Sequence, residues 1–421
     1  MLPVVVVGGG VIGLCTAFAL HQRGVPVTVL DAGPAEHAAS HVNAGWVVPT
    51  LAEPVPAPGL IATSLRWMLR SDSPLYIRPR LDPAFLRWTL HFWRSCNPRD
   101  FLAGTEATAA FGARSLALYD AMRDAGVCYE EHRDGLLFAY RTPRALEHDY
   151  AALEPVRRFG FEISPIMSGD DLRALEPSLA ATVSGGYWLP RERSLRPDTL
   201  VRGLVDYLRQ GGVEVRQATP VTGIKTTGKR AGAVFAGGER IPAETIVVAA
   251  GAWTPRLLKS LRAAVPIEAG KGYSIDLAPA PALPHPVSRP LYLHETRVAI
   301  TPLDGMIRVA GTMELSGLNH DLRPERVAAV ARSAGWAIEG WPEHTPTTGP
   351  GARVWTGPRP MTPHGLPVIG CLPGYTNLAV ASGHAMLGVT LAPATGEAVA
   401  ELVTTGHAPD IIAPFDPARF A

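Results

Sequence analysis

Residues 4–31 read VVVVGGGVIGLCTAFALHQRGVPVTVLD, and this stretch decides the fold. The valine run from Val4 to Val7 predicts a strand buried on both faces, as in a parallel sheet. Leu14 to Gln22 predict a helix, and Val25 to Leu30 predict a second strand that finishes at Asp31. Strand, helix and strand around a G-x-G-x-x-G turn are the context expected of a dinucleotide-binding βαβ unit.

The three glycines of the turn have separate tasks. Gly8 permits the tight turn, Gly10 lets the backbone approach a pyrophosphate, and Gly13 lets the helix pack close to the strand. The helix N-terminus supplies free N–H groups and positive potential. Asp31 is placed to accept a hydrogen bond from a ribose hydroxyl, and an acid there argues against a 2′-phosphate. The neighbouring predicted contacts are Val11, Ile12 and Ala32.

The composition is that of a globular chain. Its 421 residues suffice for two or three domains, with 47% hydrophobic and 18% charged residues. A net charge of +1, from 39 basic and 38 acidic side chains, argues against a general nucleic-acid binder. The scattered cysteines and histidines show no ligand spacing, so we expect no metal site and a reducing, cytoplasmic setting. No uncharged apolar run reaches the roughly 18 residues of a membrane-spanning helix.

Two further strands are predicted to end at glycine. Thr245 to Ala250 lead into Gly251, and Asn377 to Ala381 lead into Ser382-Gly383-His384, which is predicted to open a helix. A small, polar stretch at residues 39–46 follows the ribose acid. Three segments this far apart in the sequence suit a cofactor longer than a plain dinucleotide pocket requires.

Several motifs make the chain resemble the FAD-dependent D-amino acid oxidase and dehydrogenase family, and bacterial D-amino acid dehydrogenases most closely. They are the opening fingerprint, Asn43-Ala44-Gly45, Lys271-Gly272-Tyr273-Ser274, Glu314 to Gly317, Trp355 to Pro363, Gly365 to Gly370 and Ser382 to Gly388. The resemblance implies an α/β fold, in which a Rossmann-like FAD-binding domain is interleaved with an α+β substrate domain carrying a mainly antiparallel sheet. It implies non-covalent FAD and adds cofactor contacts at Ser40, Asn43, Ala44, Gly45, Trp46, Val221, Ala250, Gly251, Trp253, Arg359, Gly383, His384, Met386, Leu387 and Gly388.

The substrate site is expected around Arg359. The resemblance assigns a carboxylate-binding arginine to this position, and a guanidinium offers the bidentate fork that such a group needs. Tyr273 could share the substrate carboxylate or amine, or be a half-buried strand tyrosine. His384 could contact the flavin, or be only a cap at the helix whose N-terminus stabilises negative charge on the reduced ring.

The implied reaction is oxidative deamination of a D-amino acid. A hydride passes from Cα to flavin N5, and the imino acid hydrolyses to a 2-oxo acid and ammonia. Alternatives are a secondary or cyclic substrate (D-proline, hydroxyproline, sarcosine, glycine), a dioxygen-using oxidase, or a flavin-binding protein without turnover. Ala385-Met386 and Val389 replace the family's usual Gly-Thr and Trp, so the substrate side chain and the electron acceptor, a quinone or another compound, stay open.

The stretch from Ile61 to Cys96 holds Trp67, Trp88, Phe92 and Trp93 together with six arginines. One interpretation is peripheral contact with an anionic membrane, at the inner face of the plasma membrane, where a quinone could accept electrons. The other, which we favour, is two amphipathic helices packed on the flavin domain with snorkelling arginine stems.

Antiparallel signals between the nucleotide-binding segments predict the substrate sheet. Gly272 to Leu277, Arg297 to Pro302 and Met306 to Thr312 resemble a meander, with Asp304-Gly305 as a hairpin turn. Glu325 to Ile338 predict an amphipathic helix. The predicted FAD-binding domain comprises residues 1–85, 195–262 and 352–421, and the substrate domain comprises 86–194 and 263–351.

Overall fold

A computed structural model describes residues 2–34, 37–41, 43–60, 75–261, 263–343, 345, 347–349 and 351–420. The nucleotide-binding half is a sheet in the order β10-β2-β1-β14-β21-β20, parallel except for β20. Its strands are β1 Val4–Val7, β2 Val27–Leu30, β10 Glu214–Arg216, β14 Thr245–Val248, β20 Val368–Cys371 and β21 Leu378–Ser382. Segments from both ends and the middle of the chain therefore share one sheet. Its short strands are rich in valine and isoleucine, as expected for a parallel sheet that is covered on both faces.

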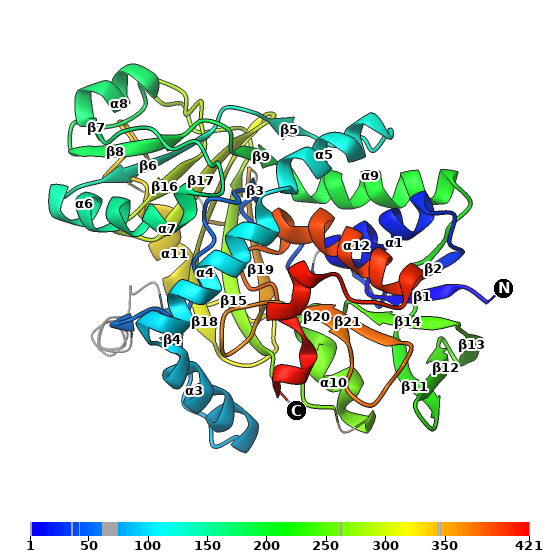
Figure 1. The fold of residues 1–421 in the computed structure, drawn as a ribbon. Coiled ribbons are helices and arrows are strands. Elements are labelled where there is room, and N and C mark those ends of the chain that lie inside the picture. Colours follow the sequence, from blue (N-terminus) through cyan, green and yellow to red (C-terminus); the bar gives the residue numbers. More distant parts are fainter. Residues whose placement is uncertain are drawn as a thin grey trace.

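Two layers cover this sheet (Figure 1). Helices α1 Val11–Gln22, α9 Pro197–Gln210 and α12 Gly388–Thr405 pack on one face through a core that includes Leu14, Leu204 and Val399. A three-stranded antiparallel sheet of β11 Val221–Thr227, β12 Arg230–Ala236 and β13 Glu239–Pro242 packs on the other face. Residues Thr254–Leu258 form the short helix α10 beside β11.

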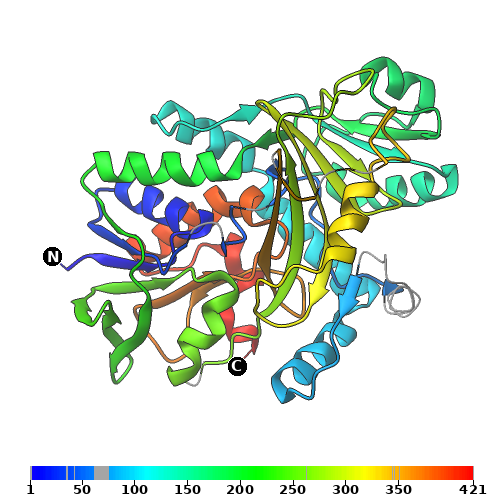
Figure 2. The ribbon, with the colours of Figure 1, turned by 180° about the vertical axis from the view of Figure 1, so that it is seen from behind.

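The second half is built on nine of the described strands. They run in the order β19-β15-β18-β17-β16-β6-β8-β7, and β4 also pairs with β18. Their bounds are β4 Leu75–Ile77, β6 Leu136–Tyr140, β7 Met167–Ser168, β8 Gly185–Leu189, β15 Glu268–Leu277, β16 Leu291–Leu293, β17 Val298–Leu303, β18 Met306–Leu315 and β19 Ala352–Met361. Helix α11 Pro324–Arg332 packs on one face through Val327 and Val330. Figure 2 shows α11, in yellow, beside the long strands of this sheet.

The remaining elements lie around the two halves. They are helices α3 Pro83–Ser95, α4 Pro98–Gly112, α5 Ser115–Asp124, α6 Pro143–Ala152, α7 Glu154–Arg157 and α8 Gly169–Leu175, and a small sheet of β3 Trp46–Val47, β9 Arg193–Leu195 and β5 Glu131–His132. None of the helices within the described ranges is both long and apolar enough to cross a membrane.

The predicted fold class is confirmed, including the mainly antiparallel second sheet and the hairpin turn at Asp304-Gly305. Two element predictions are wrong. The helix expected to open at residues 382–384 begins at Gly388, and the helix expected to run to Ile338 ends at Arg332. The domain boundaries stay a prediction, but β4 and β19, assigned to the FAD-binding segments, pair within the larger sheet.

Candidate active site

A cavity of about 620 Å³ lies where the two halves meet. The carboxyl ends of four parallel strands open into it through Val7, Leu30, Ala249 and Ala381, and Pro358 to Pro360 of β19 close the other side. The crevice beyond the carboxyl ends of the strands is where open α/β sheets bind ligands. Its volume falls within the roughly 300–1,000 Å³ of ordinary ligand pockets.

Most of the predicted contact residues meet at this cavity. The wall contains Gly8, Gly10, Val11, Ile12, Asp31, Ala32, Ser40, Asn43, Val221, Ala250, Gly251, Trp253, Arg359, His384, Met386 and Gly388. Seven predicted residues are not in the wall, namely Gly13, Ala44, Gly45, Trp46, Tyr273, Gly383 and Leu387. Six of these residues contact wall residues or adjoin them in the chain, and so lie behind the cavity wall. The seventh, Tyr273, has its side chain in the core of the larger sheet.

The glycine turn is shaped by close contact between backbones. Gly8 has φ +118°, and a Cβ there would overlap the carbonyl oxygen of Ala249 at the end of β14. A Cβ on Gly13 would overlap the Gly8 carbonyl oxygen, so glycine alone lets α1 start this close to β1. The Val11 N–H at the start of α1 donates to the Ser40 hydroxyl oxygen at 3.0 Å. That hydroxyl is left free to donate toward an anion in the cavity.

Asp31 organises the loop around the cavity as well as facing it. Its Oδ2 accepts the Gly9 N–H at 2.6 Å, and its Oδ1 accepts the Gly33 N–H at 2.8 Å. Each carboxylate oxygen keeps a second acceptor site, so the predicted contact with a ribose hydroxyl remains sterically and chemically open. The spacing of the fingerprint gave no sign of the Gly9 hydrogen bond.

The Asn43-Ala44-Gly45-Trp46 motif fixes a loop between the two halves. The Asn43 side-chain oxygen accepts the Gly45 N–H at 2.7 Å, while its amide nitrogen donates to two carbonyls earlier in the loop. Thr301 of β17 donates to the Ala44 carbonyl at 2.8 Å and accepts from the Trp46 indole at 2.9 Å. Only Asn43 of the four reaches the cavity wall; Ala44 and Trp46 tie that wall to the larger sheet, and the Gly45 carbonyl accepts the Leu195 N–H of β9 at 2.7 Å.

Arg359 is an unpaired cation at the cavity. Its Nη1 donates to the Thr312 carbonyl at 2.8 Å, and no carboxylate among the described residues lies in ion-pair range of it. Burial lowers the pKa of the guanidinium from 12.5 to about 10. A half-buried arginine at the cavity without an acid partner is costly unless a ligand supplies one, so this position fits an anionic group of a substrate.

Tyr273 is not part of the cavity, and its predicted substrate contact is corrected. Its side chain joins the core between β15 and α11, and its hydroxyl donates to Glu314 Oε2 at 2.7 Å. Lys271, two residues earlier on the same face of β15, pairs with Glu314 Oε1 at 3.0 Å. The alternation of Tyr273 with Ile275 and Leu277 is the sequence signal that could have assigned it to the core.

His384 lines the cavity, but it does not start a helix. It forms an isolated β-bridge with Met361, and Ala385 after it has φ +48°, which interrupts any helix there. Its Nε2 lies 3.0 Å from the Thr395 hydroxyl, which donates to the Leu391 carbonyl, so Nε2 carries the proton. Burial lowers the pKa of His384 to about 3, and its buried Nδ1 has no partner among the described residues. The helix N-terminus at the cavity is that of α12, at Gly388.

Sequence reasoning missed an aromatic stack in the cavity wall. His37 and His320 stack with ring centroids 4.3 Å apart, and Trp253 lies 6.4 Å from His320 on a roughly parallel plane. His37 follows β2, whereas His320 follows β18, so the stack joins the two halves across the cavity. Residues this far apart in sequence leave no one-dimensional signal. Arg256 is a further cation of the wall that was not predicted.

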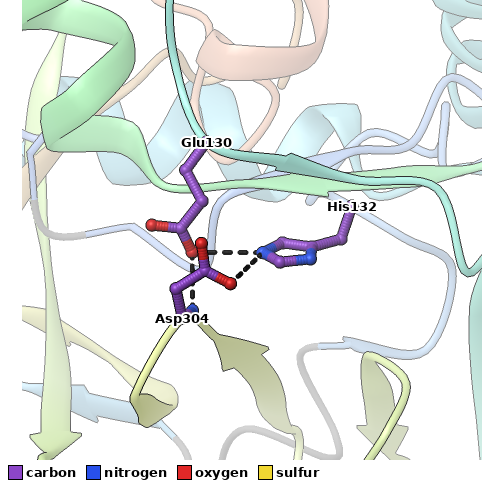
Figure 3. A group of neighbouring side chains, drawn as sticks. All are labelled: Glu130, His132 and Asp304. Carbon is purple, nitrogen blue, oxygen red and sulfur yellow. Dashed lines mark hydrogen bonds and ion pairs between the residues drawn. The ribbon is translucent and has the colours of Figure 1, made fainter.

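One group among the described residues has metal-ligand chemistry, but it lies elsewhere. Glu130, His132 and Asp304 converge between β5 and the β17–β18 turn (Figure 3). Glu130 Oε1 lies 3.1 Å from His132 Nε2 and accepts the Asp304 N–H at 2.8 Å, while Arg196 lies 3.6 Å from Glu130 Oε2. These contacts account for the group as a polar tie between the small sheet and the hairpin.

Comparison with known proteins agrees with this geometry. Residues 3–402 match the family described as "FAD dependent oxidoreductase". The chain belongs to the FAD-dependent oxidoreductase family. It is 34% identical to the D-amino acid dehydrogenase of Xanthobacter autotrophicus, covering 100% of this chain and 99% of that one, and 34% identical to that of Methylobacterium radiotolerans, covering 97% of each.

Solved structures share the fold at low sequence identity. Glycine oxidase from Geobacillus kaustophilus superimposes with a TM-score of 0.76 at 22% identity, covering 99% of this chain and 98% of that one. L-proline dehydrogenase from P. horikoshii gives 0.73 at 18% identity, covering 100% of this chain and 97% of that one. Both likenesses concern the fold.

FAD fits the described residues of this family member. The glycine turn is a cradle that a Cβ would fill, and the first turns of two helices, at Val11–Ile12 and at Gly388, lie in the cavity wall, where helix N-termini favour an anionic group. The buried Nδ1 of His384 is an acceptor without a protein partner, as expected where a ligand donates.

Proposed function

We propose that this family member oxidises a D-amino acid to its imino acid, which hydrolyses to a 2-oxo acid and ammonia. The observation that carries the proposal is Arg359, a half-buried cation at the cavity without an acid partner in the described chain. Curated relatives at 33–34% identity, including the two described above, carry the name D-amino acid dehydrogenase.

Each residue of the site has a task in this proposal. Arg359 binds the substrate carboxylate by its guanidinium fork and so fixes the position of Cα. The glycine turn, Asp31 and Ser40 hold the dinucleotide part of the cofactor, non-covalently, and the α12 N-terminus supplies positive potential. When bound, FAD supplies the acceptor for the hydride that leaves Cα.

Same-family substrates with a secondary amine, and glycine itself, are the competing candidates. Anaerobic mixing of the flavin-loaded protein with a panel of D- and L-amino acids, D-proline, sarcosine and glycine separates them. We expect the flavin absorbance to bleach with D-amino acids and not with their L-enantiomers. Equal bleaching by both enantiomers, or bleaching only by the secondary amines, contradicts the proposal.

Arg359→Lys tests the site assignment. A lysine keeps the charge but loses the planar fork, so KM for the amino acid should rise by about tenfold to a hundredfold, the loss expected when a charge-assisted hydrogen bond is removed. An unchanged KM with a carboxylate substrate shows that the carboxylate binds elsewhere.

We further propose a quinone acceptor reached by peripheral membrane contact, with α3 as the contact element. Leu86, Leu90 and Trp93 are 52%, 41% and 59% exposed, and their i, i+4, i+7 spacing places them on one face. Arg87 and Arg94 are exposed beside them. Figures 1 and 2 both show α3 projecting from the edge of the molecule.

The opposite side of α3 is packed on the protein, as the second interpretation expects, but on β18 and β19 of the larger sheet and not on the flavin domain. Phe85 and Trp88 are buried against Leu315 and Met361, and the Trp88 indole donates to the Met361 carbonyl at 3.0 Å. Residues 61–74 of the tryptophan-rich stretch lie outside the described residues. The membrane proposal therefore concerns only the exposed face of α3 that carries Leu86, Leu90 and Trp93.

Sedimentation with lipid vesicles tests the membrane proposal. We expect binding to vesicles that contain anionic lipid, weaker binding to neutral vesicles, and loss of binding in the triple variant Leu86→Ser, Leu90→Ser, Trp93→Ser. Bleaching by a D-amino acid serves as the control that the variant retains its fold. Equal sedimentation of wild type and variant refutes a membrane role for Leu86, Leu90 and Trp93. If oxygen reoxidises the reduced flavin as fast as a quinone analogue does, the proposal of a quinone acceptor is refuted.

A further inference from the structure

The side chain of Arg359 takes an unusual route across the larger sheet. Arg359 stands on β19 opposite Gly270 of β15. Its guanidinium nevertheless donates to the Thr312 carbonyl on β18, which lies on the far side of β15. The side chain therefore crosses the central strand of the three before it meets its acceptor.

Gly272 provides the space for this crossing. A Cβ at Gly272 would lie 2.5 Å from both Cζ and Nη1 of Arg359, which is far inside van der Waals contact. The backbone of Gly272 does not have a positive φ, so the position does not require glycine for conformational reasons. Lack of a side chain is thus the property that matters here.

A β-bulge presents the acceptor. Lys271 pairs with Glu314 and Tyr273 pairs with Gly311, so β18 contains one more residue than β15 between these pairs. Thr312, inside the bulge, has φ +69°, an unfavourable conformation for a β-branched residue. Bulges of this kind occur beside active sites, where they re-aim the chain, and this one turns a carbonyl toward the guanidinium.

We propose that Gly272 is a positioning residue, whose bare backbone and the Thr312 carbonyl together form the seat of the Arg359 guanidinium. The seat engages Nη1, which donates to the Thr312 carbonyl and lies 3.9 Å from Met313 Sδ, and leaves the donors on Nε and Nη2 for a carboxylate. This inference rests on the proposed carboxylate-binding role of Arg359. It adds that the affinity for the carboxylate depends on a residue that does not itself contact the substrate.

Gly272→Ala tests the seat, with Gly270→Ala as the matched control. Both glycines face the same side of β15, but the atoms nearest to a Cβ at Gly270 belong to Met313 and Met361, flexible side chains that can move aside, and not to the guanidinium. Met313 Sδ lies 3.9 Å from Arg359 Nη1, so this control perturbs a neighbour of the guanidinium without entering its space. In flavin-loaded Gly272→Ala, KM and the dissociation constant of a carboxylate that lacks an amine should rise by about tenfold or more, with a smaller change in the limiting rate of flavin bleaching. Gly270→Ala should stay within about twofold of wild type in all three values.

A cycle with Arg359→Ala separates the inference from the function on which it rests. If Gly272 acts through Arg359, adding Gly272→Ala to Arg359→Ala should cause no further loss of carboxylate affinity. Unchanged affinity in Arg359→Ala alone overturns the proposed function. Two outcomes overturn the seat but leave the proposed function standing. In the first, carboxylate affinity falls in Arg359→Ala but not in Gly272→Ala; in the second, both variants lose affinity and the two losses multiply in the double variant.

The cycle stays decisive if Gly272→Ala does not fold. Alanine at position 359 vacates the space that the new methyl group needs, so the double variant should be recovered with bound flavin and a melting temperature near that of Arg359→Ala. Recovery of the double variant alone supports the seat. Failure of both variants shows that the methyl group clashes with something other than the guanidinium, and refutes the proposal.

Discussion

Replacing Arg359 by methionine should stabilise the protein while removing its response to carboxylates. Burial lowers the pKa of Arg359 from 12.5 to about 10, which corresponds to about 3 kcal/mol of cost for the charged form in the folded state. Methionine has a similar length and no charge, and such replacements of buried charges are often stabilising. The Thr312 carbonyl loses its donor, at a cost of about 1 kcal/mol. We therefore expect a net gain of about 2 kcal/mol at neutral pH.

The sign of the pH dependence follows from the lowered pKa. The unfolded chain holds the Arg359 proton up to a higher pH than the folded chain does, so wild-type stability from this group should rise as pH climbs from about 10 toward 12.5. The free-energy cost of the charged Arg359 side chain is fully present at neutral pH, so Arg359→Met should be more stable than wild type there.

Urea unfolding of the flavin-loaded proteins checks both effects. Without ligand, Arg359→Met should have the higher midpoint. A carboxylate that lacks an amine, at a hundred times its dissociation constant, should stabilise wild type by about 2.7 kcal/mol and the variant by nearly nothing. A variant less stable than wild type, or one that carboxylate still stabilises, refutes the description of Arg359 as an unpaired cation that awaits an acid ligand.

Two further predictions address the cofactor loop and a buried acid. An asparagine at position 31 has one acceptor oxygen, so Asp31→Asn cannot accept the N–H groups of both Gly9 and Gly33. We expect the dissociation constant of FAD, measured by equilibrium dialysis, to rise by about tenfold or more. An unchanged dissociation constant means that the Gly9 contact is dispensable. Glu192 is buried, its Oε1 accepts from Thr50, and burial raises its pKa to about 7, so its contribution to stability is present below pH 4.5 and is lost as pH rises toward 7. Glu192→Gln should therefore be more stable than wild type at pH 8 by about 3 kcal/mol and similar to it at pH 4 in thermal unfolding. Equal stability of the two proteins at both pH values contradicts the assignment.

The contrast between His384 and Arg359 shows how far local pattern reaches. Ser382-Gly383-His384 followed by helix-forming residues predicts a helix start, yet the bridge to Met361 and the positive φ of Ala385 delay the helix to Gly388. The decisive partner of His384 is a strand that ends more than twenty residues earlier, so tertiary pairing overrides propensity. Arg359 was identified by resemblance, but the β-bulge and Gly272 that hold it appear only when β15, β18 and β19 lie side by side.

The sequence by itself determined the βαβ unit of residues 4–31, the other strand ends that converge on the cavity, and the family, because these depend on hydrophobic period and on glycines at fixed spacing. The tertiary structure decided which side chains face the cavity. Tyr273 and Lys271 face α11 while Gly272 faces Arg359, because one residue of register reverses the face of a strand. It also decided the stack of His37 on His320 and the isolation of Arg359 from every described carboxylate, since contacts between distant segments exist only after the two sheets have packed.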